Sequence, residues 1–402
     1  MIPVTRILVP SETKCAPGAG NYLHICKIHG SPLPPRSWVS LEAMHLEENQ
    51  PLAPFTTFAI GGPARWYVAA RSEDEIVEAI SWAQGRGIAL FVLGGGSNLL
   101  VSDAGFPGLV LHVALRGITS FEAPSIPGLA AQRIYQAAAG ESWEHFVQRA
   151  VVDQCAGVEC LAGIPGTVGG TPVQNVGAYG QEVASVIDRV RAYDLHERDF
   201  VEFNAAECAF SYRRSRFNST DRGRYLITRV DYRLAVGGPV TLRYPEHNRA
   251  LMDDRKEGEK PSPAEVAAAV RRIRQNKGML LVGDDPDCRS AGSFFKNPLI
   301  AEELFQNIAA RSAAPPPQFP AGPGQVKLPA AWLIENAGFY RGYRLGKAGI
   351  SRRHTLALVN YGDADQGGST AVEILALANQ ISGAVEAKFG IHLEMEPVLV
   401  GF

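Results

Sequence analysis

The chain has 402 residues, of which 46% are hydrophobic and 20% charged, and its net charge at neutral pH is −2. This length suggests about two to three domains with ordinary hydrophobic cores, and the nearly balanced charge excludes a sequence-wide attraction to nucleic acid or to an anionic membrane. No apolar run reaches the ~18 residues that a membrane-spanning helix needs, and no secretory signal is visible at the N-terminus.

Six cysteines are few for a chain of this length, which is typical of a cytoplasmic protein with reduced thiols rather than of a disulfide scaffold. We therefore expect a cytoplasmic protein, and we also expect a monomer with no nucleic-acid partner and no membrane insertion. Residues 1–50 are rich in proline and glycine and lack a lasting periodic pattern, so we expect a disordered extension. Its four candidate zinc ligands have a spacing that matches no common zinc site, so no metal is predicted; they are Cys15, His24, Cys26 and His29.

The regular pattern begins near Thr57, where residues 57–70 indicate a loop, a Gly-Gly-Pro turn and a strand. Ser72 and Glu75 are spaced as a capping box and predict a helix that ends at Gly85 or Gly87. Residues 88–103 then predict a buried strand that runs into the glycine loop 94–98. Ligands favour this position, beyond the carboxyl end of a strand, in α/β units.

A second amphipathic helix is predicted to begin after Ser142, and it leads into a loop with six glycines at residues 160–180. Successive backbone N–H groups in such a loop form a concave surface that suits a pyrophosphate. A glycine-rich connector without a ligand remains an alternative for this stretch alone. The stretch has no GxxxxGK[ST] and no clean strand–GxGxxG–helix pattern, so neither a P-loop nor a Rossmann turn is predicted.

Residues 186–203 predict two strands, and residues 225–236 predict one long strand with alternating faces. Between them lies FSYRRSRF, residues 210–217, in which aromatic residues flank three arginines. Such a run usually marks a solvated face. A guanidinium held against packed rings would also suit the stabilisation of a forming anion.

In the second half, Ser262, Pro263 and Glu265 predict a helix start, and cations in its last turn complement the helix dipole. The chain then leads to SAGSFFKNP at 290–298, where Ser293 could present its hydroxyl to a pocket as a proton donor or could be only a turn residue. Thr370 and Glu373 predict a last helix that stops at Gly390. Residues 391–402 predict a final strand, whose His392, Glu394 and Glu396 share either a solvated face or a polar site.

Six motifs together resemble the UDP-N-acetylenolpyruvoylglucosamine reductase family, in its longer type I subtype. They are TFAIGGPA, GGGSN, IPGTVGGTPVQNVGAYG, FSYRRS, AGSFFKNP and LEMEP, in that order along residues 51–402. The resemblance implies an α+β fold, in which an FAD-binding domain of the vanillyl-alcohol oxidase (PCMH) type precedes a smaller α/β substrate-binding domain. The first domain would cover 51–240, with subdomains at about 51–115 and 116–240. The second would cover 241–402, with a C-terminal strand that returns to the active site.

The same resemblance implies non-covalent FAD, NADPH as hydride donor, and reduction of enolpyruvyl-UDP-GlcNAc to UDP-N-acetylmuramate for peptidoglycan synthesis. The implied catalytic residues are Arg213 and Glu396 at the substrate carboxylate and Ser293 as proton donor. The implied substrate-binding residues are Tyr244, Lys277, Asn297 and His354. The implied FAD-binding residues lie in the two glycine loops: Gly94, Gly95, Gly96, Ser97, Asn98, Ile164, Pro165, Gly166, Gly169, Gly170, Gln174, Asn175, Gly177, Ala178 and Tyr179.

Two alternatives remain at this point. An FAD-dependent sugar or hydroxy-acid oxidase of the same fold would explain the two glycine loops but not AGSFFKNP together with LEMEP. A non-catalytic FAD- or UDP-sugar-binding relative would not need the three candidate catalytic residues.

Overall fold

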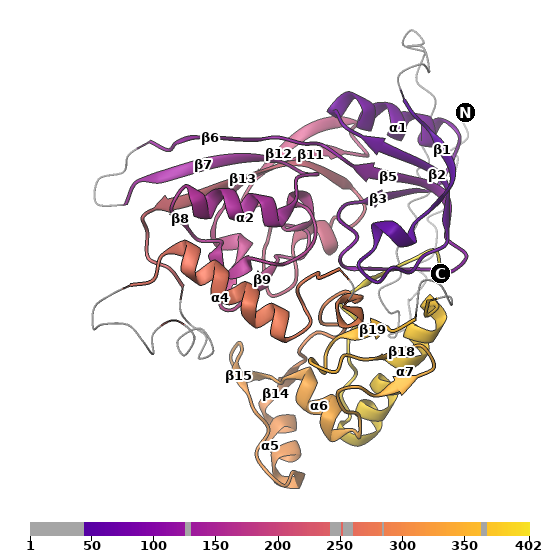
Figure 1. Cartoon of the computed structure of the whole chain (residues 1–402), viewed down its shortest axis with the longest axis vertical. Coiled ribbons are helices and arrows are strands. Elements are labelled where there is room, and N and C mark those ends of the chain that lie inside the picture. The colour runs from indigo at the N-terminus through magenta and orange to yellow at the C-terminus, as the bar shows by residue number, and fades with distance from the viewer. Residues whose placement is uncertain (1–43, 125–129, 242–250, 252–259, 284, 363–367) are drawn as a thin grey trace, which may run out of the picture.

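The computed structural model describes residues 44–124, 130–241, 251, 260–283, 285–362 and 368–402 (Figure 1). These residues form two bodies, each built around a large hydrophobic core, with a smaller core beside them. The cysteine and histidine set of the N-terminal extension and Tyr244 lie outside the described residues.

A four-stranded sheet opens the first body, with the strand order β1-β2-β5-β3. Strands β2, β5 and β3 are parallel, and β1 pairs with β2 in the antiparallel sense. The strands are β1 (Glu47–Pro51), β2 (Pro63–Ala70), β3 (Leu90–Leu93) and β5 (Phe106–Val113). Helix α1 (Glu73–Gly85) connects β2 to β3 and begins where predicted, because the Ser72 hydroxyl accepts a hydrogen bond from the Glu75 N–H. The Glu75 carboxylate accepts one from the Arg71 N–H.

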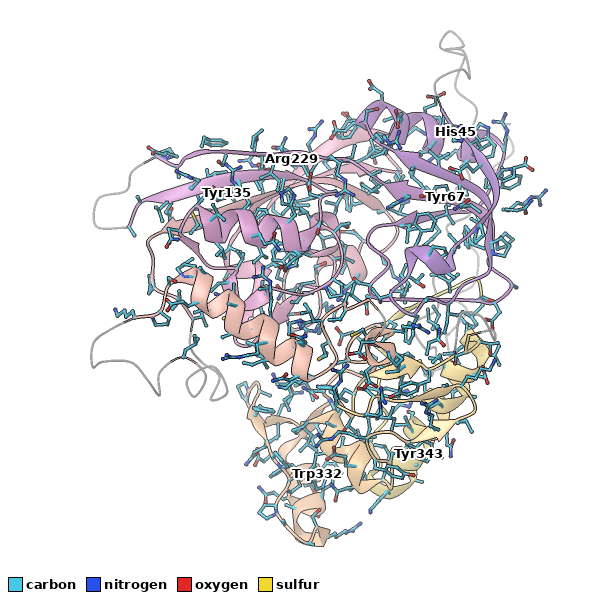
Figure 2. The ribbon with its side chains drawn as sticks, viewed as in Figure 1. His45, Tyr67, Tyr135, Arg229, Trp332 and Tyr343 are labelled. Atoms are coloured by element: carbon cyan, nitrogen blue, oxygen red, sulfur yellow. The ribbon has the colours of Figure 1, made fainter. Side chains whose placement is uncertain are left out.

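A larger antiparallel sheet completes the first body, with the main strand order β12-β11-β13-β7-β6. Its strands are β6 (Ile118–Glu122), β7 (Gln132–Ala138), β11 (Ile187–Asp194), β12 (Asp199–Asn204) and β13 (Tyr225–Val236). The predicted strands at 186–203 and 225–236 are thus confirmed. Helix α2 (Trp143–Val152) packs on this sheet, with the ring of Phe146 centred 5.8 Å from that of Tyr135, which Figure 2 labels.

Helix α4 (Pro263–Asn276) begins at the predicted Ser262–Glu265 capping box. Its apolar residues Val266 and Val270 belong to the same core as α2 and the large sheet. The domain division expected at residue 241 puts this helix in the second domain, since its amphipathic pattern gives no sign of which core it covers.

The second body carries the remaining helices and two small sheets, and Figure 2 labels its Trp332 and Tyr343. Its elements are β14 (Leu299–Ala301), α5 (Glu302–Arg311), β15 (Phe319–Pro320), β16 (Gln325–Lys327), α6 (Ala330–Asn336), β17 (Arg344–Leu345), β18 (Ala348–Ile350), β19 (Leu358–Asn360) and α7 (Ala371–Phe389). The predicted capping box of Thr370 and Glu373 opens α7, and Gly390 ends it with a left-handed φ of 67°.

The two bodies share parts of the chain. Phe58, Ile60 and Leu100 come from the first body's stretch of sequence, but they lie in the second core. Strand β20 (Val398–Val400), close to the C-terminus, pairs in parallel with β4 (Leu99–Val101). The bodies are therefore joined by packing and by a strand pair.

The predicted strand over 391–402 is wrong in extent, since only β20 forms a ladder there. Ile391 and Leu393 are buried and His392 and Glu394 are exposed, so the alternation of the sequence is kept. Pro397, directly before β20, has no N–H to donate to a ladder. The alternating pattern was interpreted as a continuous strand, but backbone pairing is limited to β20 and one isolated bridge between Phe295 and Met395.

The remaining elements are short. They are η1 (Ala53–Phe55), β8 (Cys155–Ala156), η2 (Glu159–Leu161), η3 (Val168–Gly170), β9 (Gly177–Ala178), β10 (Gln181–Glu182), η4 (Val183–Ser185), η5 (Arg216–Asn218) and η6 (Pro286–Cys288). Among the described residues, no helix combines the length and the apolar character needed to cross a lipid bilayer.

Candidate active site

The two glycine loops touch each other. A Cβ added to Gly95 would lie 2.5 Å from the Cα of Gly166, and one added to Gly96 would lie 1.7 Å from the carbonyl oxygen of Phe55. Gly96 and Gly166 also have positive φ angles, 61° and 122°. A larger side chain at Gly95 would collide with the backbone of the second loop, and one at Gly96 would collide with the backbone of Phe55, so glycine is required at both positions.

The loops also present unused hydrogen-bond donors. Within the described part of the chain, the backbone N–H groups of residues 95–98 and 166–167 find no acceptor in the protein. Donors of this kind, crowded into two touching loops, form a concave anion site. The residues present therefore fit the diphosphate of a dinucleotide cofactor such as FAD.

Asn98 ties the loops to the C-terminal segment. Its side-chain amide donates to Gln174 Oε1 at 2.8 Å and to the carbonyl oxygen of Glu396 at 3.2 Å. The Val398 N–H donates in turn to the Asn98 carbonyl at 2.9 Å. One side chain thus fixes the first loop, the second loop and the LEMEP segment relative to one another.

Asn175 supports the second loop from inside. Its side chain is buried, donates to Glu182 Oε2 at 2.9 Å and to the Ser211 carbonyl at 3.0 Å, and accepts from the Ala184 N–H at 3.1 Å. The Asn175 amide therefore makes its hydrogen bonds inside the protein, and these bonds hold the Ser211–Arg213 stretch beside the loop.

Arg213 and Glu396 form the polar centre of the site. Arg213 Nε lies 3.1 Å from Glu396 Oε1, and Arg213 Nη2 donates to the Gly177 carbonyl at 2.9 Å. Both side chains are largely buried, with exposed fractions of 22% for Arg213 and 12% for Glu396. Arg213 has a positive φ of 54°, which is unusual for a residue with a Cβ and is typical of functional sites.

The environment of Glu396 favours its neutral form. Burial raises the pKa of its carboxyl above the ordinary value, although the positive charges of Arg213 and Lys296 oppose the shift. A carboxyl with a raised pKa can donate a hydrogen bond where an ordinary glutamate would only accept one. The sequence pattern allows Glu396 either a solvated face or a polar site, and its burial beside Arg213 places it in a polar site.

Ser293 is brought next to this pair by backbone pairing. The Glu396 N–H donates to the Phe294 carbonyl at 2.8 Å, and the Lys296 N–H donates to the Glu394 carbonyl at 2.9 Å. On its other side, the Phe294 N–H donates to the Leu356 carbonyl at 2.8 Å. Among the described residues the Ser293 hydroxyl makes no hydrogen bond, so it is available to a ligand.

Thr57 connects the serine segment to the first glycine loop. Its N–H donates to the Gly96 carbonyl at 3.2 Å, and its hydroxyl donates to the Ser290 carbonyl at 2.6 Å. The TFAIGGPA motif thus spans from the loop to the serine segment.

The expected substrate residues occupy the ends of helices and loops around this centre. Lys277 is the C-cap of α4, and its Nζ lies 5.8 Å from the ring centre of Tyr179. Asn297 Oδ1 accepts from the Ala330 N–H at 2.9 Å at the start of α6. His354 lies in the loop between β18 and β19, and its Nδ1 accepts from the Leu356 N–H at 3.2 Å.

Two further residues of the site were not found from the sequence. Arg274 of α4 is buried, and it donates to the Gly163 carbonyl at 3.0 Å and to the Met279 carbonyl at 2.8 Å. Tyr212 packs beneath Lys327, whose Nζ lies 4.6 Å from the ring centre. The charge of Arg274 was attributed to helix-dipole complementarity, and no local pattern shows that this arginine supports the second loop.

The arginine run divides between two roles. Arg216 stacks on Phe203, with Cζ 4.2 Å from the ring centre, and pairs with Asp221. The expectation that a guanidinium is held against packed rings is confirmed for this residue. Arg213 lies in the site, where its Cζ is 5.4 Å from the ring centre of Tyr212.

Two protein families match this chain. Residues 64–199 match the FAD binding domain family, and residues 284–400 match the family described as UDP-N-acetylenolpyruvoylglucosamine reductase, C-terminal domain. The expected combination of an FAD-binding domain and a smaller C-terminal domain is thus confirmed. The match of 284–400 also removes the support for a simple oxidase, because it covers the part that the oxidase alternative did not explain.

Full-length relatives agree with these matches. The UDP-N-acetylenolpyruvoylglucosamine reductase of Streptomyces coelicolor is 44% identical over 380 residues, which is 92% of this chain and 94% of the relative. That of Pseudomonas syringae pv. tomato is 40% identical, over 89% of this chain and 99% of the relative. The crystal structure of the enzyme from Thermus caldophilus superposes with a TM-score of 0.58 at 26% identity, over 89% of this chain and 99% of that one.

Proposed function

The chain belongs to the UDP-N-acetylenolpyruvoylglucosamine reductase family and is an FAD-dependent oxidoreductase of peptidoglycan precursor synthesis, and we propose that Arg213, Ser293 and Glu396 carry its reaction. The single observation that carries the proposal is the convergence of these residues from three distant segments. Arg213 lies 3.1 Å from Glu396, whose N–H is bonded to the residue after Ser293.

FAD, when bound, supplies the hydride that adds to C3 of the enolpyruvyl group of the substrate. The unpartnered backbone N–H groups of residues 95–98 and 166–167 would hold its diphosphate, and the rest of the two loops, including the stretch 174–179, would form the remainder of the binding surface. Non-covalent attachment agrees with the absence of histidine from GGGSN. NADPH is the proposed hydride donor to the cofactor.

Arg213 stabilises the negative charge that develops at the substrate carboxylate as the hydride arrives. Its guanidinium is held in advance by the Gly177 carbonyl and by Glu396. A preorganised cation in a buried site needs little rearrangement as the charge forms, which is the main source of its effect on the rate. Glu396 in its neutral form adds a hydrogen-bond donor and avoids repulsion of the substrate carboxylate.

Ser293 donates a proton to C2, which completes the addition of H⁻ and H⁺ across the double bond and leaves the lactyl ether. A serine hydroxyl is a weak acid. The proton transfer is therefore driven by the strongly basic carbon that receives it, or by a relay from a neighbouring donor. Backbone pairing on both sides of Phe294 holds the hydroxyl in place.

Lys277, Asn297 and His354 are the proposed contacts of the nucleotide sugar and its phosphates. Tyr244 is proposed for the same role from the family motif, and it lies outside the described residues.

The packing of α4 with the first core supports a domain boundary after α4, and the second family match begins beyond this helix, at residue 284. We also propose that the enzyme acts as a cytoplasmic monomer.

An anaerobic titration tests the function. The purified protein should show an oxidised flavin spectrum that NADPH bleaches and that enolpyruvyl-UDP-GlcNAc then restores. Indifference to NADPH combined with rapid reoxidation by O₂ would instead identify an oxidase. A flavin spectrum that NADPH bleaches but the substrate does not restore would contradict the proposed reaction.

A further inference from the structure

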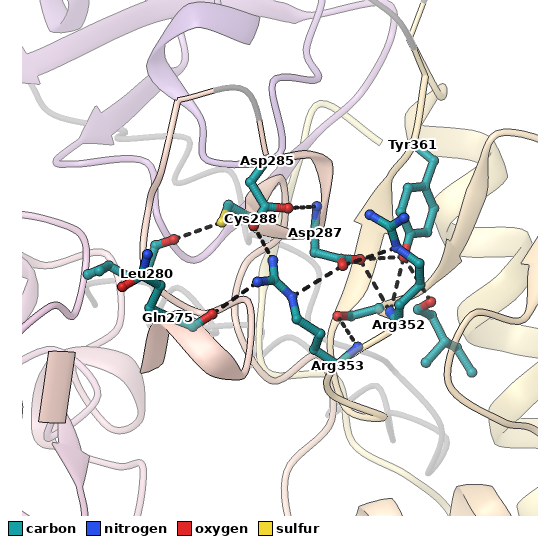
Figure 3. Close-up of polar contacts among 10 residues, drawn as sticks. Gln275, Leu280, Asp285, Asp287, Cys288, Arg352, Arg353 and Tyr361 are labelled. Carbon is teal, nitrogen blue, oxygen red and sulfur yellow. Dashed lines mark hydrogen bonds and ion pairs between the residues drawn. The ribbon is translucent and has the colours of Figure 1, made fainter. Parts of the chain in front are cut away.

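Arg353 links the two bodies through a cluster that the reaction does not use. Its Nη1 donates to the Gln275 carbonyl in α4 at 3.0 Å, its Nη2 pairs with Asp285, and its Nε lies 3.3 Å from Asp287 Oδ2 (Figure 3). We call Arg353, Asp285 and Asp287 the arginine latch. One guanidinium thus contacts the last turn of α4 and the carboxylates of Asp285 and Asp287 in the connector that follows it.

Asp287 anchors the latch in the second body. Its side chain is only 2% exposed, and it accepts from the Tyr361 hydroxyl and, at 3.2 Å each, from the N–H and Nε of Arg352. Burial alone would raise the pKa of this carboxyl, but the hydrogen bonds from Tyr361 and Arg352 and the arginine charges hold it below the usual range. Asp287 is therefore ionised at neutral pH, and each of its oxygens has partners.

The latch lies between two proposed substrate contacts. Lys277 follows two residues after Gln275, and His354 directly follows Arg353. Contact is tight at this point, because a Cβ added to Gly278 would lie 3.0 Å from Arg353 Nε. The same loop bonds to the Ser293 segment through the Leu356 carbonyl. A displacement of the loop from α4 would therefore separate Lys277 from both His354 and Ser293.

We propose that Arg353 is a positioning residue for substrate binding, which holds Lys277 and His354 at a fixed separation by joining the end of α4 to the loop between β18 and β19. The proposal rests on the proposed function, in which Lys277 and His354 contact the nucleotide sugar. Its physical basis is that a binding site loses affinity when its contacts must be ordered during binding rather than beforehand. Arg353 itself need not touch the substrate.

The test compares Arg353→Gln with Arg352→Gln in the FAD-loaded enzyme. Arg352 pairs with the same Asp287, but its side chain is 59% exposed, and among the described residues its hydrogen bonds go to Asp287 and Tyr361 rather than to α4, which makes it a matched control. Calorimetric titration of the oxidised enzyme with enolpyruvyl-UDP-GlcNAc, without NADPH, measures the Kd without turnover. We expect Arg353→Gln to raise the Kd about tenfold and Arg352→Gln to leave it within about twofold.

Two further readouts separate positioning from a general loss of structure. The limiting rate of flavin reoxidation at saturating substrate should be unchanged in Arg353→Gln, because Arg213, Ser293 and Glu396 keep their contacts. Arg353→Lys should restore part of the affinity, since it keeps the charge but cannot reach all three partners. A lower melting temperature with an unchanged Kd would overturn the proposal.

A double variant that lacks both proposed substrate contacts tests whether Arg353 acts through them. In Lys277→Ala/His354→Ala the Kd should rise, and adding Arg353→Gln should have little further effect if Arg353 acts through these residues. A fully additive effect would overturn the proposal while leaving the site assignment intact. An unchanged Kd in the Lys277→Ala/His354→Ala enzyme would reject the proposed substrate contacts and the latch proposal with them.

Discussion

Arg213 Nε lies 3.1 Å from Glu396 Oε1, although one residue follows the second glycine loop and the other belongs to the C-terminal segment. The pair is buried beside the Gly177 carbonyl and the backbone of the Ser293 segment. This arrangement supports the proposal that the guanidinium serves the substrate carboxylate.

Arg213→Ala should slow reoxidation of the reduced flavin by substrate about 10²–10³-fold, the usual effect of removing a preorganised electrostatic stabiliser. Flavin reduction by NADPH should change much less. Stopped-flow absorbance separates the two half-reactions. Arg216→Ala is the matched control from the same run, since Arg216 pairs with Asp221 outside the site, and an equal loss in both variants would remove Arg213 from the proposed role.

The pH dependence of reoxidation should follow Glu396. Because burial raises the pKa of this carboxyl, its neutral form persists above the ordinary glutamate range and is lost as the pH rises through the raised value. Reoxidation should therefore slow on the alkaline side, and Glu396→Gln should flatten that limb of the profile. An identical profile in Glu396→Gln would show that another group titrates.

The raised pKa of Glu396 also predicts how the free energy of unfolding changes with pH. A proton bound more tightly in the folded state stabilises the fold at low pH, and this contribution is lost as the pH rises from the ordinary glutamate pKa to the raised value. Above that window the ligand-free Glu396→Gln protein should be more stable than the parent. Thermal unfolding at a series of pH values measures the difference.

Ser293→Ala should leave flavin reduction by NADPH nearly intact and stall reoxidation by substrate, because only the second half-reaction needs the proton at C2. Ser290→Ala provides a nearby control, since the Ser290 hydroxyl accepts from the Gly292 N–H within the same turn. Equal slowing of both half-reactions in Ser293→Ala would contradict the role of proton donor.

Gly95→Ala should reduce the amount of FAD that remains bound after purification and lower the melting temperature, because the new Cβ would meet the backbone of Gly166 at 2.5 Å. Gly383→Ala in α7 is the control. Its Cβ would meet nothing within 4 Å, so the change should stabilise the helix by about 0.5–1 kcal/mol. Full FAD content in Gly95→Ala would show that the loops need not touch.

Local signals were the part of the structure that could be predicted from the sequence. Ser72, Ser142, Ser262 and Thr370 each begin a helix because a cap acts on the next three residues and needs no tertiary partner. The strand at 225–236 was found for the same reason, since its alternating residues are contiguous.

Contacts between side chains that are far apart in the sequence could not be predicted in this way. Asp285 and Asp287 lie in the connector after α4, and nothing in the sequence pairs them with Arg353. The side chain of Arg274 gave no sign that it would reach the Gly163 carbonyl. Residue patterns alone made Ser293, an arginine of the 210–217 run and Glu396 candidates, but each kept a structural alternative, and only the six motifs together assign the three catalytic roles.

The pairing of β4 with β20 and the burial of Phe58 and Leu100 in the second core limit how this protein can be dissected. A gene fragment that stops at the connector near residue 284 would expose two large apolar side chains and leave β4 as an open edge. Its product should aggregate when made alone and recover when the complementary fragment is co-expressed.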